Sequence, residues 1–152
     1  MTFQKKPLVW FLIFLGLAVL LATLAPIEKT LGSNARLVYF HGAWVWTAML
    51  AFMAAAISGL LGIISRRTIF HNWSLAFGRT GLLFWITFLP MSLIVMQANW
   101  NGLFLDEPRF RIPLNFAIVG LLLQVGLAFF SMPVWSSLAN IAYGIAFFWG
   151  MS

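Results

Sequence analysis

The sequence predicts an all-α membrane protein, a bundle of about five transmembrane helices with its N-terminus inside. Hydrophobic residues make up 62% of the 152 residues and charged residues only 8%, whereas a soluble domain has roughly half apolar and a quarter charged residues. The apolar residues fall into five runs, separated by short breaks that carry charges, proline or glycine. Most runs reach the length of about 20 residues that a helix needs to cross the hydrocarbon core.

The first two runs are the longest apolar features of the N-terminal half. The first, roughly residues 8 to 26, follows two lysines and exceeds the h-region of a signal peptide. Because further spans follow, we predict a retained first helix, with a cleaved signal as the alternative. The second, roughly residues 37 to 64, is long for one bilayer crossing. Its first turn or two is expected to stand in the outer interface.

Three further runs complete one polytopic domain over residues 1–152. The third, roughly residues 74 to 97, contains Pro90, which removes a backbone hydrogen bond and is expected to kink the helix. The fourth covers roughly residues 114 to 131, and the fifth, roughly 134 to 150, is short for a span. With no internal repeat and no linker, a single compact helical domain is predicted.

The basic residues predict the orientation. Lys and Arg stay on the cytoplasmic side more readily than they are translocated, and the side that carries five of the nine is taken as inside. In a soluble protein a net charge of +6 would suggest nucleic acid; here the charges flank apolar runs and predict contacts with lipid headgroups, with no nucleic-acid partner. The inner set is Lys5, Lys6, Arg66, Arg67 and Arg79, and the outer set is Lys29, Arg36, Arg109 and Arg111.

Small and polar residues inside the runs predict how the helices pack. Small residues spaced four apart mark close helix contacts in lipid, so the second helix is expected to be central. Gln124, deep in the fourth run, is expected to make an interhelical hydrogen bond. His71 is expected to be solvated in an inner loop, and Arg79 to reach the inner headgroups. The stripe of small residues is Ala54, Ser58 and Gly62, with Ala55 and Gly59 beside it.

His41 is the first candidate site residue, in the stretch ARLVYFHGAWVW at residues 35–46. An ionisable residue in a membrane helix suggests a functional role, because burying its side chain in lipid is costly. A neutral imidazole ligates iron, and nearby aromatic rings offer a flat wall for a porphyrin. His41 is therefore a candidate metal ligand to heme, with Trp44 on the same helix face. The alternative is an imidazole that sits among headgroups and hydrogen-bonds water.

The predicted outer loop ANWNGLFLDEPRFRIP, residues 98–113, is the second candidate region. Trp100 could lie against a porphyrin ring, and Arg109 and Arg111 could pair with its two propionates. Asp106 and Glu107 could orient those arginines. The alternative is an interfacial loop with a tryptophan belt and local ion pairs. No cysteine is present, which excludes disulfides and thiolate metal sites.

These two stretches resemble the membrane heme-handling proteins of cytochrome c assembly, the CcmC type. Those proteins carry a YFH-x-P-x-AW segment that enters the second helix from outside, and a tryptophan-rich outer loop that ends in WD-x-R. Here the first segment lacks the proline, and the second is partial. The residues in corresponding places are Tyr39, Phe40, His41 and Trp44, then Trp100, Asp106 and Arg109.

The resemblance covers roughly residues 10 to 130 and implies a multi-pass protein of the cell inner membrane. The family has six spans and a second heme-ligating histidine in the outer loop after the fifth, and this chain ends at about that point. The resemblance therefore implies one axial ligand from this chain, His41, with the other position open or filled by a partner.

Three functions follow from these observations. The first is a heme carrier or presenter that works with other cytochrome c assembly proteins and is not an enzyme, since it makes and breaks no bond. The second is a small helical subunit or assembly factor of a larger membrane complex, with no cofactor of its own. A transporter or channel is disfavoured, because the runs hold few polar residues beyond Gln124 and Arg79.

Overall fold

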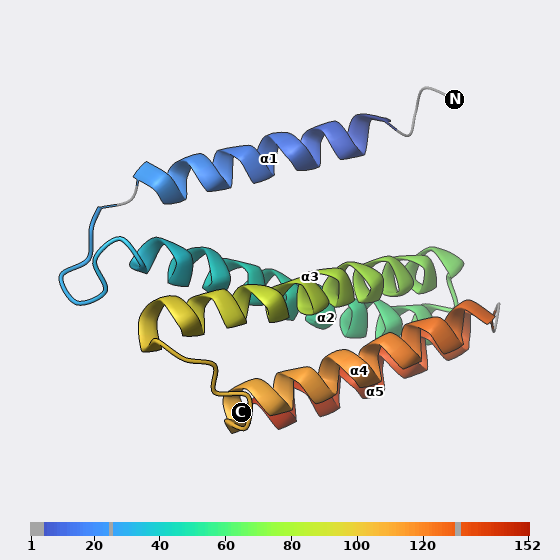
Figure 1. Ribbon diagram of the computed structural model, residues 1–152. Coiled ribbons are helices and arrows are strands. Elements are labelled where there is room, and N and C mark those ends of the chain that lie inside the picture. Colours follow the sequence, from blue (N-terminus) through green and yellow to red (C-terminus); the bar gives the residue numbers. More distant parts are fainter. Residues whose placement is uncertain (1–4, 25, 130–131) are drawn as a thin grey trace.

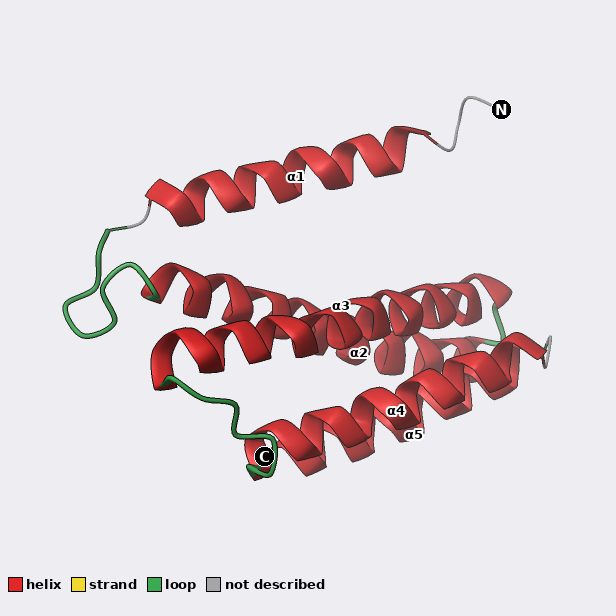
Figure 2. Cartoon of the chain, in the orientation of Figure 1, coloured by secondary structure: helices red, strands yellow, loops and turns green. Residues whose placement is uncertain are grey.

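The computed structural model describes residues 5–24, 26–129 and 132–152, which form five α-helices and no strand (Figures 1 and 2). The predicted all-α architecture is confirmed. Each helix coincides with one predicted run, and α2, α3 and α5 extend beyond theirs at both ends, whereas α1 ends at Leu24, short of the predicted residue 26. The predicted end of the fourth run, at residue 131, lies outside the described residues. The helices are α1 (Lys5–Leu24), α2 (Ala35–Ser65), α3 (Thr68–Trp100), α4 (Pro108–Phe129) and α5 (Pro133–Met151).

The first four helices are long and apolar enough to cross a membrane, which makes the chain a multi-pass membrane protein. The fifth helix has 19 residues and carries Ser136, Ser137 and Asn140 on its buried face. These polar residues lower its hydropathy, and it falls outside the set of candidate spans among the described helices. Helix α3 continues through Pro90 without interruption of its helical assignment.

The helices run alternately up and down, so their connections gather at two ends (Figure 1). The loop end holds residues 26–34 and 101–107 together with the C-terminus. The turn end holds the start of α1, residues 66–67 and the start of α5. The two predicted sets of basic residues therefore separate in space as the five-helix topology requires. Which end faces the cytoplasm stays a prediction from the charge distribution.

Helix α2 is central, as predicted, and packs against α1, α3 and α5. It joins α3 through a two-residue turn in which Arg66 has φ 55°, a left-handed conformation that ends α2. Ala55, Gly59 and Gly62 are buried, whereas Ala54 and Ser58 are only half-buried. The small-residue contact face is thus rotated slightly from the predicted stripe, because its other members are Ala48 and Ala51.

Aromatic rings fill the core between α2, α3 and α5. Trp85 and Phe147 are both 0% exposed, and their ring centroids lie 4.6 Å apart in an edge-to-face arrangement. Phe52 packs edge-to-face on Tyr143 at 5.0 Å. The indole of Trp85 donates a hydrogen bond to the Pro113 carbonyl at 3.1 Å, so its polar atom is satisfied inside the bundle.

A chain of hydrogen bonds crosses the interior from α4 to α2. Gln124 donates from Nε2 to Oδ1 of Asn140 at 2.9 Å, which confirms the predicted interhelical bond. Asn140 in turn donates from Nδ2 to the Ser74 carbonyl at 2.9 Å. The Ser74 hydroxyl donates to the Ala55 carbonyl at 2.9 Å. Four helices are therefore linked through polar groups that lipid could not satisfy.

His71 is buried, and the prediction that it is solvated was wrong. Its ring is 6% exposed, and its Nδ1 lies 2.7 Å from the Ser137 hydroxyl. Helix α3 begins at Thr68, six residues before the predicted apolar run, so His71 belongs to the first turn of the helix. The ring packs so closely on Gly62 that a Cβ there would lie 2.7 Å from Nδ1. Arg79 has an exposed side chain, as predicted.

Replacement of Gly78 by alanine tests the packing around the amide pair. A Cβ at Gly78 would lie within 2.9 Å of atoms of both Asn140 and Gln124, whereas Gly126 has nothing within 4 Å. We expect Gly78→Ala to destabilise the protein by about 1–3 kcal/mol through overpacking, and Gly126→Ala to be neutral or slightly stabilising, because alanine favours helix. Denaturation in detergent micelles measures both. Equal stability of the two variants would contradict this packing.

Replacement of Asn140 by leucine tests the hydrogen-bond chain. The variant keeps the side-chain size but leaves the Gln124 Nε2 without its acceptor and removes the side-chain donor to the Ser74 carbonyl, so we expect a loss of about 1–3 kcal/mol. The matched control is Asn115→Leu, at an exposed position of α4, which should be tolerated. The same denaturation assay measures both. An Asn140→Leu protein as stable as the control would show that these hydrogen bonds contribute nothing to the stability of the protein.

Candidate functional site

His41 lies in the second turn of α2, at the loop end, and turns its ring toward α3. Its Nε2 lies 2.8 Å from the Ser92 hydroxyl, and its ring meets Phe88 edge-on with centroids 5.7 Å apart. The side chain is half-buried. A metal-binding histidine commonly uses one ring nitrogen for the metal while a hydrogen bond on the other fixes the ring. Ser92 provides such a fixing bond to Nε2, so Nδ1 is the nitrogen that would have to meet a metal.

Trp44 lies one turn further along α2 and also contacts α3. Its indole Nε1 donates to the Thr87 hydroxyl at 2.8 Å. Its ring packs on Phe84 with centroids 4.6 Å apart and on Phe40 at 5.3 Å. His41 and Trp44 therefore contact neighbouring turns of α3. The indole of Trp44 also packs in a cluster of aromatic rings.

Trp100 is the last residue of α3. The next residue, Asn101, has φ 51°, which ends the helix and starts the loop. The indole is 52% exposed and meets Phe104 edge-on at 6.0 Å. Trp100 thus presents an open ring at the loop end and is not part of the core.

Arg109 and Arg111 stand in the first turn of α4, on either side of the buried Phe110. The side chain of Arg109 is 85% exposed, and its Nε lies 3.8 Å from Oε1 of Glu107. This is the local pairing with an acid that the sequence predicted, and its exposure makes it weak. Arg111 is also exposed. Both guanidinium groups can change position at little cost.

The five predicted site residues share one end of the bundle but do not form one cavity. The start of α2 and the end of α3 are tied by Asn34, which donates from Nδ2 to the Ala98 carbonyl at 2.8 Å. Across the described chain, no hydrogen bond, ion pair or ring contact joins His41 to the other four. Nor do three metal-binding His, Asp or Glu side chains gather anywhere in the described ranges.

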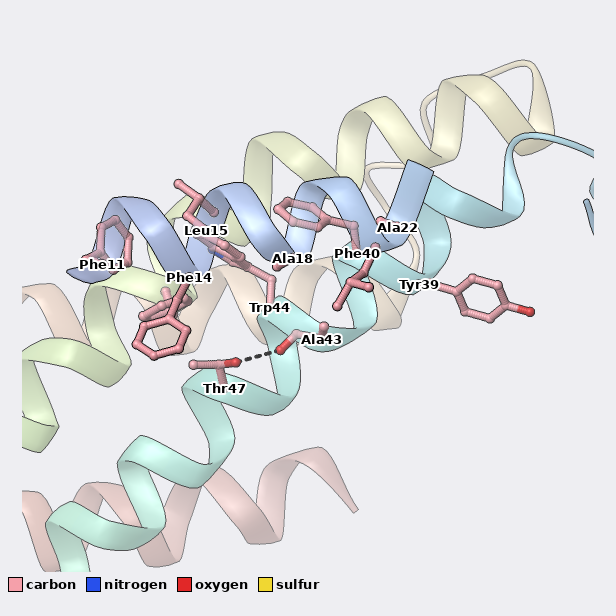
Figure 3. Close-up of a pocket in the computed structure, with 12 residues that line it drawn as sticks. Phe11, Phe14, Leu15, Ala18, Ala22, Tyr39, Phe40, Ala43, Trp44 and Thr47 are labelled. Carbon is pink, nitrogen blue, oxygen red and sulfur yellow. Dashed lines mark hydrogen bonds between the residues drawn. The ribbon is translucent and has the colours of Figure 1, made fainter. Parts of the chain in front are cut away.

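An aromatic groove of about 540 Å³ lies beside this region, between α1 and α2 (Figure 3). Phe14 and Ala18 of α1 and Phe40 and Trp44 of α2 line it, and Figure 3 shows the Tyr39 hydroxyl pointing away from them. Trp44 is the predicted site residue that lines it. Sequence reasoning missed this groove, although aromatic residues three or four apart on both helices are its signal.

The loop before α2 is held by Glu28. Its carboxylate accepts hydrogen bonds from the backbone N–H of Leu31 at 2.7 Å and of Thr30 at 2.8 Å, and from the Thr30 hydroxyl at 2.9 Å. These donors favour the charged carboxylate and hold the pKa of Glu28 below its ordinary value of 4.5. The resulting turn closes through Gly32, whose φ of 59° suits glycine.

Acidification should open this turn. Because the pKa of Glu28 is lowered in the folded chain, its stabilising effect is complete above 4.5 and is lost as the pH falls through the lowered pKa. We expect an NMR titration of the Glu28 carboxyl carbon to give a midpoint below 4.5, and Thr30→Val to move that midpoint upward. A wild-type midpoint at or above 4.5 would show that the hydrogen bonds do not form.

Comparison with known proteins adds a partial similarity. A curated protein of Marchantia polymorpha, a putative cytochrome c biosynthesis ccmC-like mitochondrial protein, is 31% identical over 101 residues. The aligned part covers 66% of this chain and 43% of that protein, so the chain spans less than half of its relative's length. No protein-family model matches the chain. No solved structure matches it either.

Proposed function

We propose that this chain is a membrane component of cytochrome c assembly that holds heme at the loop end through His41. The observation that carries the proposal is the placement of His41: a half-buried imidazole near a membrane boundary, with one nitrogen held by Ser92 and the ring of Phe88 edge-on to it. The name of the Marchantia relative, a cytochrome c biosynthesis protein, supports the same process.

The chemistry of the residues at the loop end fits heme as a cargo. An imidazole nitrogen is an iron ligand, and Trp44 and Trp100 offer aromatic faces to a flat macrocycle. Arg109 and Arg111 carry exposed guanidinium groups that can pair with propionates. Since these groups are not assembled around His41, they would have to move toward the cargo. Trp100 and Arg109 are more than half exposed, so little packing resists that movement.

In the proposed role the chain positions its cargo and carries out no chemistry. The heme iron supplies an open coordination position that accepts an imidazole nitrogen. Ser92 keeps the His41 ring turned toward α3, so that a single nitrogen is presented. Because the chain makes and breaks no covalent bond, it acts as a carrier and not as an enzyme. We place the loop end on the outer face of the cell inner membrane, from the distribution of basic residues.

A second candidate function is a small helical subunit or assembly factor that binds a larger membrane complex and no cofactor. Helix α1 favours it, since among the described helices α1 packs only against α2. No residue in its apolar segment is buried. A helix that leaves so much of its surface open, beside an aromatic groove, offers room for a helix of another membrane protein.

The visible spectrum of the purified protein distinguishes the two functions. Protein from a heme-replete host should show a Soret band, and His41→Ala should abolish or shift it, because the iron loses its nitrogen ligand. The matched control is His71→Asn, which removes the other histidine of the chain at the opposite end of the bundle and should keep the band.

Two results would overturn the heme proposal: wild-type protein without heme from a heme-replete host, or an unchanged spectrum for His41→Ala. Stoichiometric copurification with membrane proteins, together with full function of a His41→Phe variant, would then establish the subunit role.

A further inference from the structure

The turn end carries a polar pocket that the proposed function does not use. It has a volume of about 210 Å³ and lies between α3, α4 and α5. Helix α3 contributes a cation, an imidazole and an amide to its wall, and α5 contributes a hydroxyl. These polar lining residues are Arg79, His71, Asn72 and Ser136.

An apolar groove of about 700 Å³ adjoins this pocket along α5. Leu127 and Met132 line both, so the polar pocket and the groove lie next to each other. Trp135 and Ala142 extend the groove toward the middle of the bundle. Together they place polar side chains beside an apolar groove.

The charges near the pocket are positive and uncompensated by acids of this chain. Arg66 and Arg67 form the exposed turn at the same end as Arg79. The three acidic residues of the chain, Glu28, Asp106 and Glu107, all lie in the loops of the opposite end. A ligand at Arg79 therefore meets a positive field, which favours an anion.

The ring of His71 lines the same pocket, where it can hydrogen-bond an anion. The Ser137 hydroxyl holds its Nδ1 at 2.7 Å, and the ring rests on Gly62. The ring is therefore fixed, and Nε2 is the nitrogen left to meet a ligand. Asn72, the next residue on α3, has an exposed side chain that lines the same pocket.

We propose that the polar pocket and the adjoining groove together bind one anionic phospholipid, independently of any heme at the loop end. The phosphate lies in the polar pocket against Arg79 and His71, and one acyl chain lies in the groove along α5. Basic pockets between membrane helices bind anionic headgroups through charge-assisted hydrogen bonds. The adjoining groove favours a lipid over free phosphate, because free phosphate would leave the apolar surface of the groove uncovered.

Native mass spectrometry of delipidated protein tests this proposal. The probes are dioleoyl phosphatidylglycerol, phosphatidylcholine with the same acyl chains, and inorganic phosphate. We expect one phosphatidylglycerol to bind the wild type, and binding to weaken about tenfold in Arg79→Gln, since it loses a charge-assisted hydrogen bond. The matched control is Arg67→Gln, which removes the same charge at the same end but outside the pocket. It alters only the surrounding field, so it should weaken binding much less than Arg79→Gln does.

The groove is tested by its own pair of variants. Ala142→Phe fills the groove and should weaken phosphatidylglycerol binding, whereas Ala146→Phe, exposed on α5 outside both cavities, should not. Three results would overturn the proposal: equal binding by Arg79→Gln and Arg67→Gln, equal binding of phosphatidylcholine, or binding of inorganic phosphate as tight as that of the lipid. Thermal unfolding of each variant without lipid confirms that it is folded.

Discussion

Asn140 is the junction on which the bundle depends. A membrane interior offers no water, so each polar side chain must find its partner inside the protein. The Asn140 amide meets this requirement for α5, because it accepts from Gln124 of α4 and donates to Ser74 of α3. Ser74 carries the connection on to the backbone of α2. This series of hydrogen bonds fixes the rotation of α5. It explains why α5 packs against three other helices with its polar residues Ser136, Ser137 and Asn140 facing inward.

The helices were predictable from the sequence, because apolar run length decides where a helix can span. The position of Gln124 deep in the fourth apolar run was enough to predict its interhelical hydrogen bond, because no water is present there to bond its amide. Its partner Asn140 was not predictable, because the fifth run is short and polar for a membrane span. Its position against the other helices did not follow from the sequence. His71 was misplaced for a related reason: α3 begins before the predicted apolar run, and His71 in its first turn contacts Ser137 of α5. Hydropathy alone does not reveal such a turn.

The candidate site was predictable in its chemistry and less so in its geometry. The sequence identified an imidazole, two indoles and two guanidinium groups that belong to one end of the bundle, and the structure places them there. Whether they converge depends on side-chain directions that spacing does not determine. His41 turns toward Ser92, while Trp100 and Arg109 project from the surface. The aromatic groove escaped prediction because it arises only when α1 and α2 lie together.

The two ends of the molecule thus present different chemistry: the loop end carries exposed aromatic rings and all three acids, and the turn end carries arginines without a nearby acid. The proposed role in heme binding requires that His41 ligates the iron. Resonance Raman spectroscopy of heme-loaded, untagged His71→Asn protein tests it most directly, because His41 is then the only one of the two histidines of the chain that remains. Ligation by His41 predicts an iron–histidine stretching band that moves to lower frequency when the cells are grown on histidine with the heavier nitrogen isotope. A spectrum in which no iron–nitrogen band responds to that isotope would contradict it.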